Sequence, residues 1–173
     1  MSYFVVVLCA IFSFLLGRYL NTILVKAKRN RVKKKKEEID YNNKKYNFKG
    51  SDDLKMVFLV RQDLKMKAGK IAAQVAHAAL GLYDDIIFGN DKYQQEALDF
   101  WVNYGQKKIV LKVPDLETMN NALKKCKQAN IANCMITDAG CTQIPPGSKT
   151  VLGIGPDTSE KINKITGSFK LMH

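Results

Sequence analysis

The sequence predicts an α/β domain built around a mixed β-sheet. Apolar stretches of strand length alternate along the chain with longer amphipathic stretches of helix length, an order that places helices against a sheet. Late in the chain two strand-like stretches, 133–140 and 149–156, follow one another with only a loop between them, which favours a mixed sheet over a purely parallel one. An apolar content of 46% in 173 residues is enough to form a hydrophobic core.

The first half of the domain is predicted to be a strand followed by two helices. The stretch LKMVFLVRQD, residues 54–63, is an apolar run that breaks into charged residues at its end. After the loop LKMKAGK, the stretch IAAQVAHAALGLY has helical spacing and is expected to end before Asp84. A second helix is expected at about 91–104, where Ala97, Leu98 and Trp101 are among the apolar residues.

The second half continues the alternation. KKIVLKV, residues 107–113, has the composition of a strand, and DLETMNNALKKCKQAN, residues 115–130, spaces its apolar residues by three and four, as an amphipathic helix does. NCMITDAG and KTVLGIGP are predicted to be the third and fourth strands, with Pro156 as the stop of the fourth. SEKINKITG is predicted to close the domain as a helix.

An apolar N-terminus predicts a membrane anchor at residues 1–25. The run from Tyr3 to Val25 holds about 23 residues, enough to span a bilayer, and the side chain of Arg18 can snorkel to the membrane surface. The basic stretch KAKRNRVKKKK follows the run. A cleaved signal peptide carries its charge before the apolar region, and a matrix presequence is amphipathic. A retained anchor with the rest of the chain in the cytosol fits best.

A basic collar and linker is expected to follow the anchor at 26–53, and the folded domain is expected at 54–173. Lys and Arg number 28 against 16 Asp and Glu, a formal charge of +12, which favours phosphate backbones or anionic membrane surfaces as partners. The four cysteines form no CxxC pair and the histidines number two. This pattern is not that of a zinc site, so no metal is expected.

Two stretches carry candidate functional residues. In the loop DAGCTQIPPGSKTVLGIGP, residues 138–156, prolines and glycines force tight turns between an acid, hydroxyls and an amide. In the first helix, Lys70, Gln74 and His77 stand at i, i+4 and i+7, so they share one helical face. A decorated turn and a solvated helix face explain either stretch on its own.

The chain resembles the archaeal and eukaryotic (second-type) peptidyl-tRNA hydrolases. RQDLKMKAGKIAAQVAHAALGLY is similar to the family's signature helix, and the likeness continues through KKIVLKV, ITDAGCTQIPPGSKTVLGIGP and INKITGSFKLM. The resemblance implies a three-layer α/β/α domain around a four-stranded mixed sheet, which often forms a homodimer and uses no metal or organic cofactor. It also implies hydrolysis of the ester that joins a peptide to the 3′ end of tRNA.

The resemblance also assigns site residues: Lys70, Asp138, Thr142 and Thr150 as catalytic, and Gln74, His77 and Gln143 as substrate-binding. In such a site Asp138 orients or deprotonates water, Lys70 stabilises negative charge, and the threonines offer hydroxyls. The residue that takes the proton is left open. A membrane-anchored adaptor that binds tRNA or protein without turnover is the alternative function. The resemblance favours the mitochondrial outer membrane for the anchor, with the endoplasmic reticulum as the other choice.

Overall fold

The computed structural model describes residues 19, 20, 22, 26, 47–139 and 144–172. The fold lies within the unit Tyr46–His173. Most of the predicted anchor, most of the predicted collar and linker, and the candidate site residues Thr142 and Gln143 lie outside the described residues.

Four strands form one mixed sheet in the order β2-β1-β4-β3. Strand β4 is antiparallel to both of its neighbours, β1 and β3, whereas β1 and β2 are parallel. The central strands are therefore β1 and β4, and β4 is buried along nearly its whole length. The bounds of the strands are β1, Leu54–Arg61; β2, Lys108–Val113; β3, Asn133–Thr137; and β4, Lys149–Thr158.

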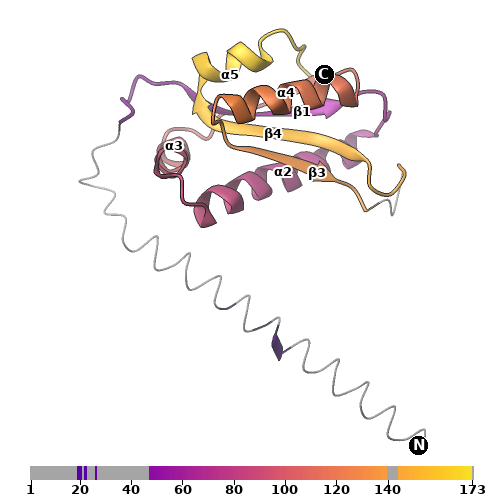
Figure 1. Cartoon of the computed structure of the whole chain (residues 1–173), viewed down its shortest axis with the longest axis horizontal. Helices are drawn as coiled ribbons and strands as arrows, with labels where there is room; N and C mark the ends of the chain where they lie inside the picture. Colours follow the sequence, from indigo (N-terminus) through magenta and orange to yellow (C-terminus); the bar gives the residue numbers. More distant parts are fainter. Residues whose placement is uncertain (1–18, 21, 23–25, 27–46, 140–143, 173) are drawn as a thin grey trace, which may run out of the picture. The chain divides into compact units, whose positions relative to one another are not determined.

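Helices cover both faces of this sheet (Figure 1). Helices α2 (Ala68–Phe88) and α3 (Lys92–Asn103) pack on one face, and α4 (Leu116–Gln128) and α5 (Ser159–Thr166) pack on the other. Side chains alternate along β1, so that Phe58 packs in the core under α2 and α3 while Leu59 packs in the core under α4 and α5. The architecture is thus the expected three-layer α/β/α fold around a four-stranded mixed sheet.

Helix α2 and strand β4 both continue beyond their predicted ends. Helix α2 does not end before Asp84 but continues to Phe88, because Ile86 keeps the helical spacing of Leu82 and is buried. Strand β4 does not stop at Pro156 but continues to Thr158. The register between β1 and β4 shifts between Lys55 and Val57, where Gly155 and Pro156 of β4 lie opposite Met56 alone. A proline within such a bulge interrupts no ladder hydrogen bond.

The two edges of the sheet differ in what covers them. The C-terminal segment covers the outer edge of β2: the backbone N–H of Lys112 donates to Lys170 O over 2.8 Å, and that of Met172 donates to Val110 O over 2.9 Å. Strand β3 forms the other edge, and among the described strands β4 is its one neighbour in the sheet. Its side chains are half-buried up to Ile136 and exposed at Thr137, unlike those of the central strands.

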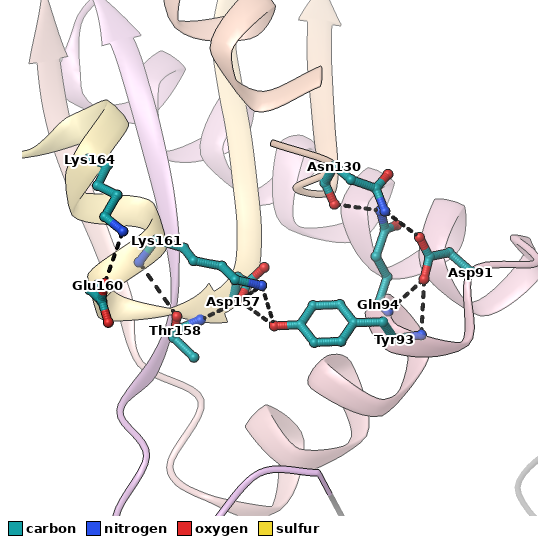
Figure 2. A network of polar contacts seen from close by, with 9 residues as sticks. All are labelled: Asp91, Tyr93, Gln94, Asn130, Asp157, Thr158, Glu160, Lys161 and Lys164. Atoms are coloured by element: carbon teal, nitrogen blue, oxygen red, sulfur yellow. Dashed lines mark hydrogen bonds and ion pairs between the residues drawn. The ribbon is translucent and has the colours of Figure 1, made fainter. Parts of the chain in front are cut away.

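A polar network anchors the C-terminal end of β4 to helices α3 and α5 (Figure 2). The carboxylate of Asp157 is buried and accepts from the hydroxyl of Tyr93 over 2.8 Å. Lys161 donates to the same hydroxyl over 2.7 Å and lies 3.5 Å from Asp157 Oδ1. Burial raises the pKa of Tyr93 above that of a free tyrosine. The network therefore fixes the end of β4 that is opposite to Thr150.

Candidate active site

Asp138 follows directly after β3 and is the acidic centre of the site. Its backbone is held by two hydrogen bonds to the segment before β4: its N–H donates to Ser148 O over 2.9 Å, and its carbonyl accepts from Gly147 N over 2.8 Å. The residue is 7% exposed. A carboxylate this deeply buried needs donors close by, because burying a charge without partners costs on the order of several kcal/mol.

Helix α2 supplies two of these donors. Lys70 Nζ forms an ion pair with Asp138 Oδ2, and Gln74 Nε2 donates to the same oxygen over 2.7 Å. Residues spaced by four on a helix lie one above the other on one face, so both side chains reach the same point on the sheet. The shared face predicted for Lys70 and Gln74 therefore meets Asp138.

Thr150, the second residue of β4, extends this chain of contacts. Its hydroxyl donates to Gln74 Oε1 over 2.6 Å, and the carbonyl of Ile136 lies 3.4 Å from the same hydroxyl. The residue has no exposed surface, and Gln74 is 4% exposed. The hydroxyl has one proton, which it donates to the amide oxygen, while the amide nitrogen donates to Asp138. Because Thr150 and Gln74 are both buried, they hold the Asp138 carboxylate from inside the domain.

The arrangement combines a buried ion pair with an oriented amide. In a site largely closed to water, an ammonium and a carboxylate interact more strongly than they do at the surface. The Lys70 side chain is 12% exposed and that of Asp138 is 6% exposed, so both reach the boundary between core and surface. Such a pair can hold a water molecule at the carboxylate and place positive charge beside a developing oxyanion.

His77 is also on α2 but is exposed, and it takes no part in the hydrogen bonds that join Lys70, Gln74, Asp138 and Thr150. The structure thus brings together four of the seven predicted site residues. Of the remaining three, His77 stands one turn further along α2, and Thr142 and Gln143 lie outside the described residues.

Arg61 is a residue of the site region that the sequence reasoning did not single out. It ends β1, and its Nη1 donates to Lys149 O over 2.9 Å, next to Thr150. Asp63 pairs with the same guanidinium and holds it in place. The available signal was the charged end of the first strand, RQD, where an arginine stands beside an acid.

The described residues contain no group of three or more His, Cys, Asp and Glu side chains that could hold a metal ion. Within the same part of the chain, one helix, α2, is long and apolar enough to cross a membrane. That helix buries Gln74, Ala78, Leu82 and Ile86 and packs in the core against the sheet. Lysines surround the site end of the sheet: Lys65, Lys67 and Lys149 are exposed.

Comparison with known proteins relates this chain to one family. The family model described as peptidyl-tRNA hydrolase PTH2 matches residues 54–172. A peptidyl-tRNA hydrolase of Sulfurisphaera tokodaii is 49% identical over 118 residues, which are 68% of this chain and 98% of that protein. One of Methanothermobacter thermautotrophicus is 43% identical over 119 residues, 69% of this chain and all of that protein.

A human relative carries the name peptidyl-tRNA hydrolase 2, mitochondrial. It is 46% identical over 121 residues, which are 70% of this chain and 65% of that protein. The matched region in each case is about the length of the α/β/α domain. The family model and the relatives agree, and the chain belongs to the PTH2 family of peptidyl-tRNA hydrolases.

Proposed function

We propose that this chain hydrolyses the ester bond of peptidyl-tRNA and releases free tRNA and an N-substituted amino acid or peptide. The observation that carries the proposal is the buried ion pair of Lys70 and Asp138, held by Gln74, in a domain that matches the PTH2 family. The reaction is that of a carboxylic ester hydrolase acting on a charged tRNA.

In the proposed mechanism Asp138 positions a water molecule and assists its deprotonation as it attacks the ester carbonyl. Lys70 stabilises the negative charge that develops on the carbonyl oxygen or on the leaving ribose oxygen. Water attacks directly, without a covalent enzyme intermediate. Cys126 and Cys134, the described cysteines, are poor candidate nucleophiles because burial raises the pKa of both thiols, that of Cys126 to about 12.

Gln74 and Thr150 are assigned a positioning role in this mechanism, because both amide atoms of Gln74 and the hydroxyl proton of Thr150 already have partners within the domain. Thr142 is proposed as a catalytic hydroxyl, and His77 and Gln143 as substrate contacts, on the strength of the family resemblance. The exposed side chain of His77 suits a contact with a bound molecule.

The proposal is tested with N-acetyl-aminoacyl-tRNA as substrate. The full chain in detergent, and a fragment that begins at Ser51, should both release the N-acetyl amino acid and leave the tRNA intact. Asp138→Asn is the matched control, since it keeps the shape of the side chain and removes its charge. Binding of tRNA with no turnover by the wild-type chain would favour the alternative, a tRNA- or protein-binding adaptor on the same fold.

The remaining parts of the proposal concern the location of the enzyme. We assign residues 1–25 to a membrane anchor, 26–53 to a basic collar and linker, and 54–173 to the hydrolase domain, with this domain in the cytosol. The mitochondrial outer membrane is favoured because two relatives, human and bovine, carry mitochondrial names, and the endoplasmic reticulum is the other choice. A homodimer is proposed from the family resemblance.

A further inference from the structure

Among the described residues, the outer edge of β3 has backbone groups without a partner in the sheet, and this edge leads to the site. In the antiparallel ladder with β4, Asn133 pairs with Ile154 and Met135 with Leu152. The N–H of Gly155 donates to Ala132 O over 2.8 Å, so Ala132 directs its backbone toward β4. Residues along such a strand alternate, and Asn133 and Met135 therefore direct their N–H and C=O groups away from β4.

Within the described part of the chain, no hydrogen bond reaches the outward backbone groups of Asn133 or Met135. The opposite edge of the sheet, in contrast, is paired with the C-terminal segment through Lys112 and Met172. An unpaired edge is a template for one more strand. The question is which chain occupies it.

The position of this edge in the site points to the occupant. Strand β3 ends at Thr137, and the next residue is Asp138. Strand β4 begins near Asp138 with the exposed Lys149, and the exposed Lys65 lies in the loop that leads from β1 to α2. Positive charge thus gathers at the Asp138 end, where a tRNA would lie. The open edge extends from the carboxylate in the other direction along the sheet.

We propose that the peptide moiety of the substrate adds to the sheet along β3, parallel to that strand, with its C-terminal ester at Asp138. The inference rests on the proposed function, because the occupant is the acyl part of a peptidyl-tRNA. The orientation follows from the chemistry: the peptide is esterified through its C-terminal carbonyl, and β3 reaches Asp138 with its own C-terminal end.

Pairing through the backbone suits a substrate of variable sequence. Main-chain hydrogen bonds supply affinity in strand addition, and side chains add specificity where pockets receive them. The side chains of β3 are half-buried, so α2 and α4 leave this edge partly open on both faces. A bound peptide can therefore direct side chains of different size into solvent.

Helix α2 provides the wall on one side of this edge. It approaches β3 so closely at Gly81 that a Cβ atom there would lie 2.5 Å from Cys134 Sγ. Lys70 and His77 are spaced by seven residues and lie on the same side of α2. Since Lys70 reaches Asp138 from that side, a peptide along β3 passes the exposed ring of His77.

The first test measures hydrolysis by the full wild-type chain of N-acetylated tRNA substrates with one to six amino-acid residues. Each added residue that gains a hydrogen bond to β3 should raise kcat/KM by about 2- to 10-fold. A strand of five residues spans about 16 Å, so the gain should level off after about four peptide residues. Equal kcat/KM for all lengths would overturn the inference and leave the proposed function standing.

The second test uses tetrapeptide substrates in which one backbone nitrogen carries a methyl group. Methylation should lower kcat/KM at alternate positions, because every second residue of an added strand faces β3. Equal losses at all positions, or none, contradict strand pairing. If the wild-type chain hydrolyses none of these substrates, including the unmethylated ones, then the proposed function itself is wrong.

A protein variant separates substrate pairing from self-association. Met135→Pro removes the outward N–H at a position where an edge strand tolerates proline, and Met135→Leu is the control that keeps the N–H and a similar volume. The ratio of kcat/KM for long and short substrates should fall toward 1 in Met135→Pro alone. A change from dimer to monomer in sedimentation, with the ratio unchanged, would identify the edge as an interface between copies and overturn the inference.

Discussion

Thr150 donates its hydroxyl proton to Gln74 Oε1 over 2.6 Å, and this contact sets the orientation of the Gln74 amide. With its oxygen engaged by Thr150, the amide turns its Nε2 toward Asp138, which accepts at 2.7 Å. The position of the carboxylate is therefore determined from within the domain core. Substitutions along this chain of contacts should affect turnover more than substrate affinity.

Gln74→Leu should lower kcat by about 10- to 100-fold, because it removes a hydrogen bond to a charged group. KM should change little, since the buried side chain lies beneath the carboxylate. Steady-state kinetics with N-acetyl-aminoacyl-tRNA separates the two parameters. Gln94→Leu, which removes an amide that donates to Asn130 O, is the control and should leave both unchanged. A raised KM with normal kcat would show that Gln74 contacts the substrate.

Gln74→Glu provides a further readout of the positioning role. It keeps an acceptor for Thr150 but places a second carboxylate against Asp138. Two carboxylates in contact disfavour joint ionisation, so the acidic limb of the pH profile of kcat should move to higher pH than in the wild-type enzyme. A profile that coincides with that of the wild type would exclude the contact between residue 74 and the reacting carboxylate.

Asp138→Ala and Lys70→Ala should each lower kcat by about 10²- to 10³-fold, the size of loss expected when one acid–base or electrostatic contributor is removed. The two groups share one ion pair, so the double variant should be little slower than either single variant. Single-turnover rates measure the loss in each variant, and a separate binding assay checks that each variant still binds tRNA. Turnover near wild type in Asp138→Ala would assign water activation to another residue.

Thr150→Val should lower kcat by less than Asp138→Ala does, because it removes a hydrogen bond between neutral groups. Thr166→Val is the matched control: its hydroxyl is also buried and donates to Ile162 O over 2.9 Å in α5. Both variants should lose similar thermal stability, whereas kcat should fall in Thr150→Val alone. Equal kcat in the two variants would mean that Thr150 contributes to folding and not to the site.

The fold was predictable because its apolar residues follow the periods of helices and strands. The run of apolar residues in β1 and the three- and four-residue spacing of the apolar residues in α4 identify both elements from sequence. The ends of α2 and β4 were less accessible to this reasoning. The bulge that contains Pro156 depends on the pairing of β4 with β1, which are about a hundred residues apart along the chain, and local composition does not contain that pairing.

The candidate site was partly accessible in the same way. Helical spacing alone brings Lys70 and Gln74 to one face, but Asp138 is 68 residues away from Lys70 in sequence, and its assignment came from the family resemblance. The direction of the Thr150 hydrogen bond could not be predicted, since a hydroxyl can donate or accept. The contact of Arg61 with the start of β4 likewise depends on the sheet order β1-β4.

The exposed lysines near the site should govern the salt dependence of tRNA binding. Each phosphate contact contributes roughly 0.7 to 0.9 to the slope of log affinity against log salt concentration. Lys65→Gln and Lys149→Gln should each reduce that slope by about this amount. Lys164→Gln, a change in α5 at a lysine paired with Glu160, is the control and should leave it unchanged. If the affinity of the wild-type chain for tRNA did not depend on salt, the basic residues would be assigned to contacts with the membrane and not with tRNA.

The N-terminal segment should behave as an integral membrane anchor. We expect the full chain to sediment with membranes and to resist carbonate extraction, because about 23 apolar residues are enough to span a bilayer. A chain that lacks residues 1–36 should be soluble and hydrolyse N-acetyl-aminoacyl-tRNA at the wild-type rate, since the hydrolase domain begins at about Leu54. Replacing Lys33, Lys34, Lys35 and Lys36 by Gln tests the role of the collar: this variant should still resist carbonate, while protease protection should report a mixed orientation, because Lys and Arg next to an apolar span determine which side stays in the cytosol. Release of the full chain by carbonate would exclude a spanning segment and leave a peripheral, charge-dependent association with the membrane surface.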